Sequence, residues 1–243
     1  MALPALPRIS NHTDFDPLRL HPQVEFHFVG PADPLPSCDL IVLPGSKNTR
    51  SDLEWLRARG WHEHLRRHLR YDGRVIGVCG GFQMLGGAVH DPHGVEGEPG
   101  STAGFDLLDI ETELARDKQL RRVEGRLTFA DAAVTGYEIH AGVTRGAGLA
   151  GTVADLGHGH DGARSGDNCI LGTYLHGLFD AAAARDALLR WAGLADPDAA
   201  PAYAELREAG LDRLADACTD HLDLDALAPL LGLEASALHR RED

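Results

Sequence analysis

Residues 74–85 read RVIGVCGGFQML, and this stretch decides the fold. A short apolar run leads into Cys79, which is followed by two glycines and by the beginning of a helical pattern. Residues 77–81 fit G-x-C-x-G, the cysteine version of a nucleophile elbow, in which a strand turns sharply into a helix. The stretch therefore predicts a buried strand that presents a thiol at its carboxyl end.

The glycines around this thiol have a physical purpose. A tight turn crowds its neighbours, so small residues at Gly77 and Gly81 let the backbone pass while Cys79 adopts a strained conformation. The positive end of the helix dipole favours the thiolate, and the N–H of Gly80 points toward any oxyanion that forms when the thiolate attacks a carbonyl. The alternative interpretation is a structural cysteine, because cysteine is among the most buried residue types.

The segments before the elbow predict a parallel sheet. Apolar runs of strand length occur at 24–29, 38–44 and 74–79, each bounded by Gly, Pro or Asp. Between the last two runs, Ser51 and Glu54 form a capping box at the start of a helical pattern. Strands and helices in alternation are typical of an α/β fold, with a mostly parallel sheet and helices on both faces.

The pattern changes after the elbow. Period-2 alternation with glycine punctuation across residues 104–145 predicts antiparallel or mixed strands, and the Gly-rich segment that follows predicts a loop or a loose hairpin. The run NCILGTYLHGLFD predicts a buried strand that ends at His176, and Asp180 is predicted to cap a helix through Trp191. The Ala- and Leu-rich tail has helical spacing and predicts C-terminal helices.

A thiolate nucleophile also needs a base, and the chain contains fourteen histidines. His176 stands out because it ends an apolar strand, and the functional residues of open α/β sheets collect at the carboxyl ends of strands. His140, in GYEIHAG, has a similar setting and is the second choice. His158 and His160 lie on a Gly-rich loop, where solvated side chains are the simpler interpretation, so no metal site is predicted.

The composition excludes several classes of function. The chain has 243 residues, 43% of them hydrophobic, and a net charge of −14, which would repel nucleic acid and anionic membranes. No apolar run approaches the roughly 20 residues that span a bilayer, and the N-terminus lacks a signal-peptide pattern. Four cysteines without C-x-x-C spacing indicate reduced thiols. We therefore expect a soluble, cytoplasmic protein that binds neither nucleic acid nor membrane.

Six segments taken together resemble one family. They are LPRISNHTDFDPL, LPGSKNTRSDLEWLR, GVCGGFQMLG, DPHGVEGEPG, GYEIHAGVT and LGTYLHGLFD, in family order from residue 6 to about 180. In these segments the chain resembles the glutaminase domain of cobyric acid synthase, one of the triad-type (class I) glutamine amidotransferases. PRISN and PGSKNT favour this branch over the relative that makes the a,c-diamide.

The resemblance implies a flavodoxin-like class I glutamine amidotransferase fold and assigns roles to several residues. Cys79 would attack the side-chain amide of glutamine, releasing ammonia and leaving a glutamyl thioester for water to cleave, with His176 as general base and acid. Gly80 and the backbone of Gly45 and Ser46 would form the oxyanion hole. The remaining substrate-binding residues implied are Gln83, which would help hold the glutamine, and Glu138 and His140, which match the family near the site.

Two features depart from the family. Many class I amidotransferases have an acid two residues after the histidine, where this chain has Leu178. We expect the group that orients His176 to lie on another domain, which would make the isolated chain a weak glutaminase. The ATP-using synthetase domain is also missing: no G-x-x-x-x-G-K-[ST] loop occurs, and Lys47 lacks the glycine spacing. No cofactor is expected in this chain, and ATP and Mg²⁺ are expected on the synthetase partner.

These inferences predict three regions: a lead-in of the interdomain type at 1–22, a glutamine amidotransferase domain at 23–195 and a helical extension at 196–243. The predicted function is to supply ammonia from glutamine to an ATP-dependent synthetase domain or subunit that amidates cobyrinate, a corrinoid, during cobalamin synthesis. One alternative is a glutaminase subunit for another amidating ligase, such as one acting on cell-wall precursors. Two others are a non-catalytic docking domain and a cysteine peptidase of the same architecture.

Overall fold

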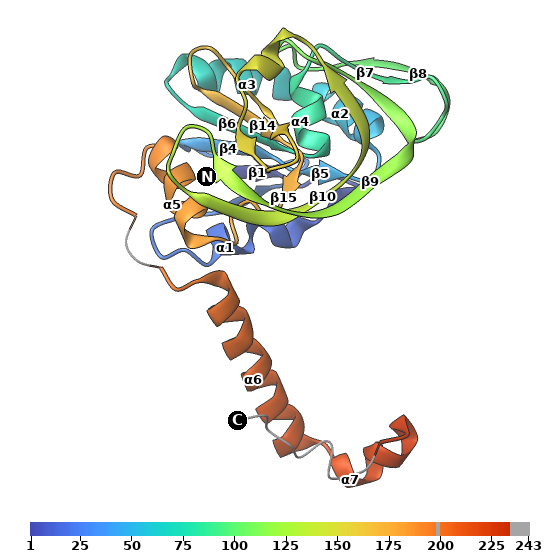
Figure 1. Ribbon diagram of the computed structural model, residues 1–243, viewed down its shortest axis with the longest axis vertical. Helices are drawn as coiled ribbons and strands as arrows, with labels where there is room; N and C mark the ends of the chain where they lie inside the picture. The colour runs from blue at the N-terminus through green and yellow to red at the C-terminus, as the bar shows by residue number, and fades with distance from the viewer. Residues whose placement is uncertain (198–199, 234–243) are drawn as a thin grey trace. The chain divides into compact units, whose positions relative to one another are not determined.

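The computed structural model describes residues 1–197 and 200–233. The chain divides into two compact units, Met1–Ala200 and Pro201–Asp243. The first unit holds every strand of the described residues, and the described part of the second unit is helical (Figure 1).

The main sheet of the first unit has six strands. Five run parallel, and the edge strand β13 is antiparallel to its neighbour. Every residue of the two strands β4 and β14 is buried, which is typical of a parallel sheet covered on both faces. The predicted α/β fold is therefore confirmed. In spatial order the strands are β13 (Ala163–Arg164), β14 (Ile170–Thr173), β6 (Arg74–Val78), β4 (Leu40–Leu43), β1 (Ala2–Pro4) and β3 (His27–Val29).

The helices of the first unit begin at positions that differ from the prediction. The first long helix starts after Asn48, whose side chain accepts a hydrogen bond from the N–H of Ser51, so the capping box predicted at Ser51 is wrong. Asp180 does not cap the last helix either, because the N-cap position is Ala181. The helices are α1 (Asp16–Arg19), α2 (Thr49–Arg57), α3 (Trp61–Arg70), α4 (Gly80–Leu85) and α5 (Ala182–Trp191), with the 3-10 helices η1 (His12–Phe15) and η2 (Ala147–Ala150).

A second sheet confirms the antiparallel strands predicted after residue 104. Its centre is a long ribbon of two antiparallel strands, β9 and β10, which run side by side in Figure 1. Their register shifts between His140 and Gly142, where the ribbon has a bulge. The Gly-rich segment contains the short antiparallel hairpin β11–β12, which confirms the hairpin of the two predicted alternatives. The strands are β7 (Ala88–Asp91), β8 (Gly100–Ala103), β9 (Glu111–Leu127), β10 (Ala133–Arg145), β11 (Ala154–Asp155), β12 (His160–Asp161) and β15 (Leu175–His176).

The chain passes from one sheet to the other at Tyr174. The predicted strand that ends at His176 is in fact two strands, β14 in the main sheet and β15 in the second sheet. Strand β15 pairs with β10, and His176 lies opposite Tyr137. This crossing holds His176 beside the carboxyl ends of the parallel strands.

The N-terminal residues belong to the fold, so the lead-in predicted at 1–22 is wrong. Strand β1 lies in the main sheet between β3 and β4. Strand β2 (Ile9–Ser10) pairs with β5 (Gly45–Ser46) in a separate two-stranded ladder. The sequence pattern missed β1 because its three residues are too few to show a period. The compact unit therefore begins at Met1 rather than at residue 23.

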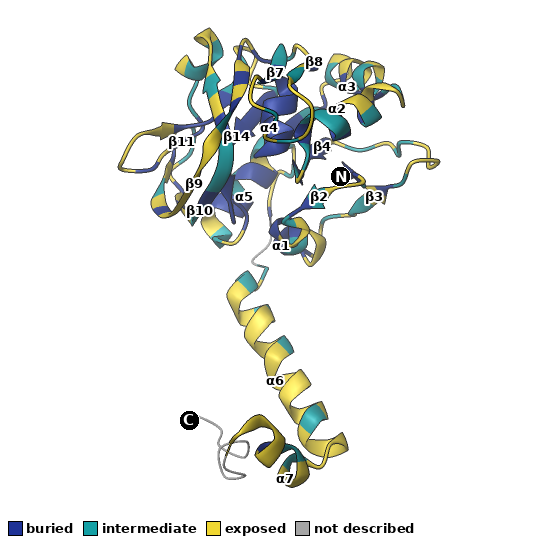
Figure 2. Cartoon of the chain, turned by 90° about the vertical axis from the view of Figure 1, so that its right-hand side faces the viewer, coloured by how far each residue is buried: buried dark blue, intermediate teal, exposed yellow. Residues whose placement is uncertain are grey.

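The second unit contains α6 (Tyr203–His221), α7 (Leu224–Leu227) and the 3-10 helix η3 (Ala228–Leu231). The division after Ala200 lies close to the boundary predicted at 196. Helix α6 contains no buried residue, as Figure 2 shows by its largely exposed colouring. The part of the predicted extension at 234–243 lies outside the described residues. Within the described residues, every helix is too short or too polar to cross a membrane.

Candidate active site

Cys79 occupies a strained turn between β6 and α4, as the elbow motif predicts. Its φ is 52° and its ψ is −108°, a conformation that side-chain-bearing residues rarely adopt. A Cβ on Gly77 would lie 2.6 Å from the carbonyl oxygen of Gly81, and a Cβ on Gly81 would lie 2.0 Å from that of Leu43. The N–H of Cys79 donates to the carbonyl of Thr173 at 2.8 Å. The glycines thus leave the space that this turn requires, and the main sheet fixes the turn.

His176 is held by a buried carboxylate that the sequence did not reveal. Its Nδ1 lies 2.6 Å from Oδ2 of Asp14, and the exposed fractions are only 1% and 7%. The ring of Tyr137 stacks on the imidazole at a centroid distance of 5.1 Å. Because Nδ1 is engaged with Asp14, Nε2 is the nitrogen left for catalysis. Nε2 is buried and makes no hydrogen bond within the described residues.

Asp14 reaches this histidine although the two lie 162 residues apart in the chain. The strand pair β2–β5 fastens the segment before Asp14 to the loop that carries Ser46. Directly after Asp14, Phe15 packs against Phe179 with ring centroids 6.2 Å apart, and both rings are buried. The expectation that another domain supplies the orienting group is therefore wrong: Asp14 of this chain holds that position, and Leu178 is buried.

The surroundings of His176 favour its charged form. Burial by itself would lower the pKa of His176, but the hydrogen bond to Asp14 and the neighbouring Cys79 outweigh it and raise the pKa to about 9. At neutral pH the imidazole therefore carries a proton. A protonated imidazole beside Cys79 stabilises a thiolate, and it can give its proton to a leaving nitrogen.

Cys79 and His176 line one cavity of about 140 Å³. Both residues are buried, since Cys79 is only 9% exposed and His176 only 1%. The Sγ of Cys79 lies 3.7 Å from the carbonyl oxygen of Ile139, in strand β10. Three other predicted site residues line the same cavity, namely Ser46, Gln83 and His140.

The predicted oxyanion-hole residues adjoin this cavity. A Cβ on Gly80 would lie 3.0 Å from the backbone nitrogen of Ser46, and a Cβ on Gly45 would lie 3.7 Å from Cε1 of His176. The N–H of Gly80 has no acceptor inside its helix, because it belongs to the first turn. The backbone nitrogen of Ser46 thus lies close to Gly80, the residue directly after Cys79.

Gln83 and His140 are fixed by a shared neighbour, Tyr174. The Nε2 of Gln83 donates to the hydroxyl of Tyr174 at 3.2 Å. The ring of His140 stacks on that of Tyr174 at 3.8 Å, and its Nδ1 lies 2.9 Å from the carbonyl oxygen of Gly142. Burial lowers the pKa of His140, so this imidazole is neutral where His176 is charged. The two histidines of the site therefore have different charge states at neutral pH.

Glu138 differs from the prediction, because it does not line the cavity that contains Cys79. Its carboxylate is 5% exposed and pairs with Arg121 and with Nε2 of His158, the latter at 3.4 Å. Glu138 and Arg121 line a different cavity, of about 380 Å³. Alternation along β10 explains the difference: Tyr137 stacks on His176, so its neighbour Glu138 points to the other face.

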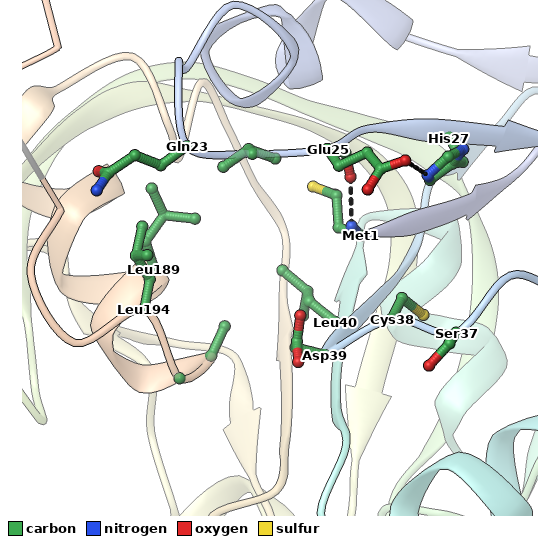
Figure 3. A pocket seen from close by; sticks show the side chains of 13 residues that line it. Met1, Gln23, Glu25, His27, Ser37, Cys38, Asp39, Leu40, Leu189 and Leu194 are labelled. Atoms are coloured by element: carbon green, nitrogen blue, oxygen red, sulfur yellow. Dashed lines mark hydrogen bonds and ion pairs between the residues drawn. The ribbon is translucent and has the colours of Figure 1, made fainter.

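Another cavity, of about 370 Å³, lies at the opposite end of the main sheet (Figure 3). It is lined by Leu40, at the start of β4, and by Cys38 and His27. Burial raises the pKa of the Cys38 thiol, and His27 pairs with Glu25 at 3.0 Å. Burial therefore disfavours the thiolate form of Cys38. Within the described residues, no group of three or more His, Cys, Asp or Glu side chains is arranged to hold a metal ion.

Fold and site together define a class: an α/β protein that presents a cysteine at a strand-to-helix elbow, in one cavity with a histidine held by a buried acid. The comparisons give the family. Residues 1–184 match the CobB/CobQ-like glutamine amidotransferase domain, so the chain belongs to this family and is a glutamine amidotransferase.

Solved structures share the fold at low sequence identity. A crystal structure of a glutamine amidotransferase matches with a TM-score of 0.57 and 16% identity, covering 79% of this chain and 99% of the other. The structure of PurLQS from Thermotoga maritima matches with a TM-score of 0.53 and 16% identity, covering 72% of this chain and 85% of the other. These similarities confirm the class I glutamine amidotransferase fold.

Replacing Asp14 with asparagine is expected to lower kcat by roughly 10²- to 10⁴-fold, because the imidazole loses the group that fixes its tautomer. It should also move the alkaline limb of the kcat/KM profile to lower pH. His176 holds its proton below a pKa of about 9 and loses it as the pH rises through that value. Without the carboxylate of Asp14, burial of the imidazole is expected to lower the pKa of His176. The measurement is glutamate release from glutamine between pH 6 and 10.

The matched control is Asp16→Asn, since Asp16 lies two residues away and pairs with Arg19 at 3.2 Å. The Asp16→Asn enzyme is expected to keep the wild-type kcat and the wild-type position of the alkaline limb in the kcat/KM profile. An Asp14→Asn enzyme with the wild-type alkaline limb would show that Asp14 does not set the charge of His176.

Proposed function

We propose that the chain hydrolyses free glutamine at Cys79 and supplies the ammonia to an ATP-dependent synthetase partner. The observation that carries this proposal is that Cys79 and His176 line one cavity while Asp14 engages the far nitrogen of the imidazole. The family supports the reaction type, since its members are glutamine amidotransferase domains.

The first half of the reaction releases ammonia. The thiolate of Cys79 forms a bond to the amide carbon of glutamine, and the oxyanion accepts hydrogen bonds from the backbone N–H groups of Gly80 and Ser46. His176 then gives its Nε2 proton to the amide nitrogen as the C–N bond breaks. Ammonia leaves, and the γ-carbonyl of the glutamyl group remains bound to sulfur as a thioester.

The second half returns the enzyme to its starting state. Neutral His176 accepts a proton from water as the water oxygen attacks the thioester carbon. The C–S bond then breaks, glutamate leaves and the thiolate of Cys79 is restored beside a protonated imidazole. Throughout the cycle, Asp14 keeps a proton on Nδ1, so that Nε2 alone exchanges protons with the substrate.

We infer that the ammonia is used to amidate peripheral carboxylates of a cobyrinate corrinoid, on a synthetase domain or subunit that binds ATP and Mg²⁺. PRISN and PGSKNT support this acceptor, and both segments lie at the site: the first carries Ser10, and the second carries Ser46 and Lys47. A cell-wall precursor ligase is the alternative partner for the same glutaminase chemistry. Asp14 also removes the reason for expecting weak activity in isolation, because the orienting acid belongs to this chain.

The acceptor can be tested by isotope transfer. The chain is mixed with an ATP-dependent cobyrinate synthetase, ATP, Mg²⁺, a cobyrinate a,c-diamide and glutamine labelled with ¹⁵N in its amide. We expect mass spectrometry to find ¹⁵N in the corrinoid amides, and to find none when ATP is omitted. The corrinoid assignment is wrong if glutamine is hydrolysed but no ¹⁵N reaches the corrinoid. Transfer of ¹⁵N to a cell-wall precursor, in the presence of the ligase for that precursor, would instead support the alternative acceptor.

A further inference from the structure

Both lysines of this protein line the cavity that contains Cys79. The sequence has 23 basic Lys and Arg side chains, of which Lys47 and Lys118 are the only lysines. The two lie far apart in the chain, the first in the loop after β5 and the second in β9. The cavity wall includes no arginine. Within the described residues, neither lysine forms an ion pair with a carboxylate.

The same cavity wall contains one carboxylate, that of Glu96. Its position is fixed by the protein backbone: the N–H groups of Val95 and Glu96 donate to Asp91 at 2.7 and 2.9 Å, and Asp91 is fully buried. The side-chain amide of Asn48 donates to the carbonyl of Glu96. The carboxylate itself accepts a hydrogen bond from the N–H of Arg50 at 3.2 Å. Glu96 is therefore held at the cavity before any ligand binds.

From this arrangement we propose that the cavity recognises the amino-acid head of free glutamine, with Glu96 binding the α-ammonium group and Lys47 and Lys118 binding the α-carboxylate. The inference rests on the proposed function, and it names the part of the substrate that the nucleophile does not touch. A small cavity with one anionic and two cationic side chains suits a zwitterion, since each charge of the ligand meets the opposite charge.

Charge pairing of this kind would make the enzyme prefer free glutamine to a glutamine residue within a peptide. A glutamine residue inside a peptide has a peptide bond on each side, so it carries neither the α-ammonium nor the α-carboxylate charge. It would therefore leave Glu96 and the lysines without partners. Burial raises the pKa of Glu96, and a bound cation would offset that cost. The arrangement thus favours a glutaminase over the peptidase alternative.

The first test changes Glu96 to glutamine and follows the kinetics of glutamate release. We expect KM for glutamine to rise roughly 10- to 100-fold, the range for loss of a charged hydrogen bond, with kcat changed less than about threefold. The substrate analogue 4-carbamoylbutanoate lacks the α-amino group, and on the wild-type enzyme its KM should exceed that of glutamine by a similar factor. For the Glu96→Gln enzyme, KM for the analogue should be close to KM for glutamine, because this enzyme no longer has the carboxylate that binds the α-ammonium group.

The matched control is Glu98→Gln, since Glu98 lies two residues away, is exposed and does not line the cavity. Its KM should stay within twofold of the wild-type value. The assignment of the ammonium group to Glu96 is wrong if Glu96→Gln keeps the wild-type KM for glutamine. It is also wrong if the ratio of KM for the analogue to KM for glutamine is the same in Glu96→Gln and in the wild type.

The second test replaces Lys47 and Lys118 with glutamine, singly and together, and compares glutamine with its α-carboxamide. The double variant should raise KM for glutamine by roughly 10-fold or more and should lose most of the preference for glutamine over the carboxamide. A double variant that keeps both the KM and the preference would overturn the assignment of the carboxylate.

These outcomes are distinct from failure of the proposed function. A wild-type enzyme that releases glutamate, with variants that keep the wild-type KM, refutes only the recognition of the amino-acid head. A wild-type enzyme that releases no glutamate, alone or with the synthetase, refutes the proposed glutaminase and the recognition with it. Reaction of Cys79 with iodoacetamide provides the folding control, because this reagent has no amino-acid head and should modify all variants at similar rates.

Discussion

Replacing Cys79 with serine is expected to reduce the release of glutamate from glutamine by roughly four to six orders of magnitude. Nucleophile and base act as a unit, so the loss of one member removes nearly the whole contribution of the pair. A serine hydroxyl has a much higher pKa than a thiol and does not form the anion beside an imidazolium at neutral pH. The measurement is glutamate formation with glutamine in excess, together with labelling by a glutamine-mimicking electrophile that should no longer modify the protein.

Cys38 provides the matched control for this experiment. It is a free cysteine at the opposite end of the main sheet, where burial raises its pKa. Cys38→Ser is expected to keep the wild-type rate and to leave labelling at Cys79 intact. Substantial glutaminase activity in Cys79→Ser, or labelling that moves to Cys38, would show that the nucleophile is not Cys79. A wild-type protein that neither releases glutamate nor reacts with the electrophile would favour a non-catalytic docking domain.

Substitution of Gly81 by alanine is expected to lower the free energy of unfolding by roughly 3 kcal/mol or more. The added Cβ would lie 2.0 Å from the carbonyl oxygen of Leu43, and this oxygen belongs to the backbone of a buried central strand. The helix α4 would have to move away from β4, which would also displace Cys79. We therefore expect a lower urea midpoint in equilibrium unfolding and a loss of most glutaminase activity in the protein that still folds.

Gly87→Ala is the control, because Gly87 lies just after the same helix and has more space. The nearest atom to an added Cβ there, the carbonyl oxygen of Ile110, is 3.7 Å away, an ordinary van der Waals distance. Its urea midpoint should stay close to that of the wild type. Equal midpoints for Gly81→Ala and the wild type would mean that the elbow does not depend on the absence of a side chain at this position.

The elbow could be predicted from sequence because its determinants are local. Gly77, Cys79 and Gly81 lie within five consecutive positions, and the turn needs small residues at fixed offsets from the thiol. The parallel sheet could be predicted for a similar reason, since β4 and β6 are short apolar runs bounded by turn residues. His176 was identified by its place at the end of such a run, although the chain changes sheets two residues earlier.

Asp14 could not be predicted, because its contact with His176 depends on tertiary structure alone. No local pattern marks which of the chain's 37 acidic residues will reach the imidazole. The sequence pattern around Asp14 predicts only a lead-in, since β1 is too short to show a strand pattern. The pairing of β2 with β5 and the contact of Phe15 with Phe179 bring it to the site.

The surroundings of the side chains in β10 were also beyond the sequence pattern. Glu138 and His140 both match the family segment, yet only His140 lines the cavity with Cys79. Alternation along β10 places both side chains on the same face, so their different surroundings depend on the elements packed against that face, which a single sequence does not show. The convergence of Glu96, Lys47 and Lys118 was missed for the same reason, since these residues come from three separate segments.

The crossing of the chain at Tyr174 has a consequence for catalysis. Cys79 follows a strand of the parallel sheet, and His176 lies in a strand of the antiparallel sheet. The sulfur and the imidazole therefore belong to separate layers, which the backbone at Tyr174 connects. Catalytic alignment is therefore sensitive to any sliding of one layer against the other. A displacement of either layer by a few tenths of an ångström would change the distance between the sulfur and the imidazole.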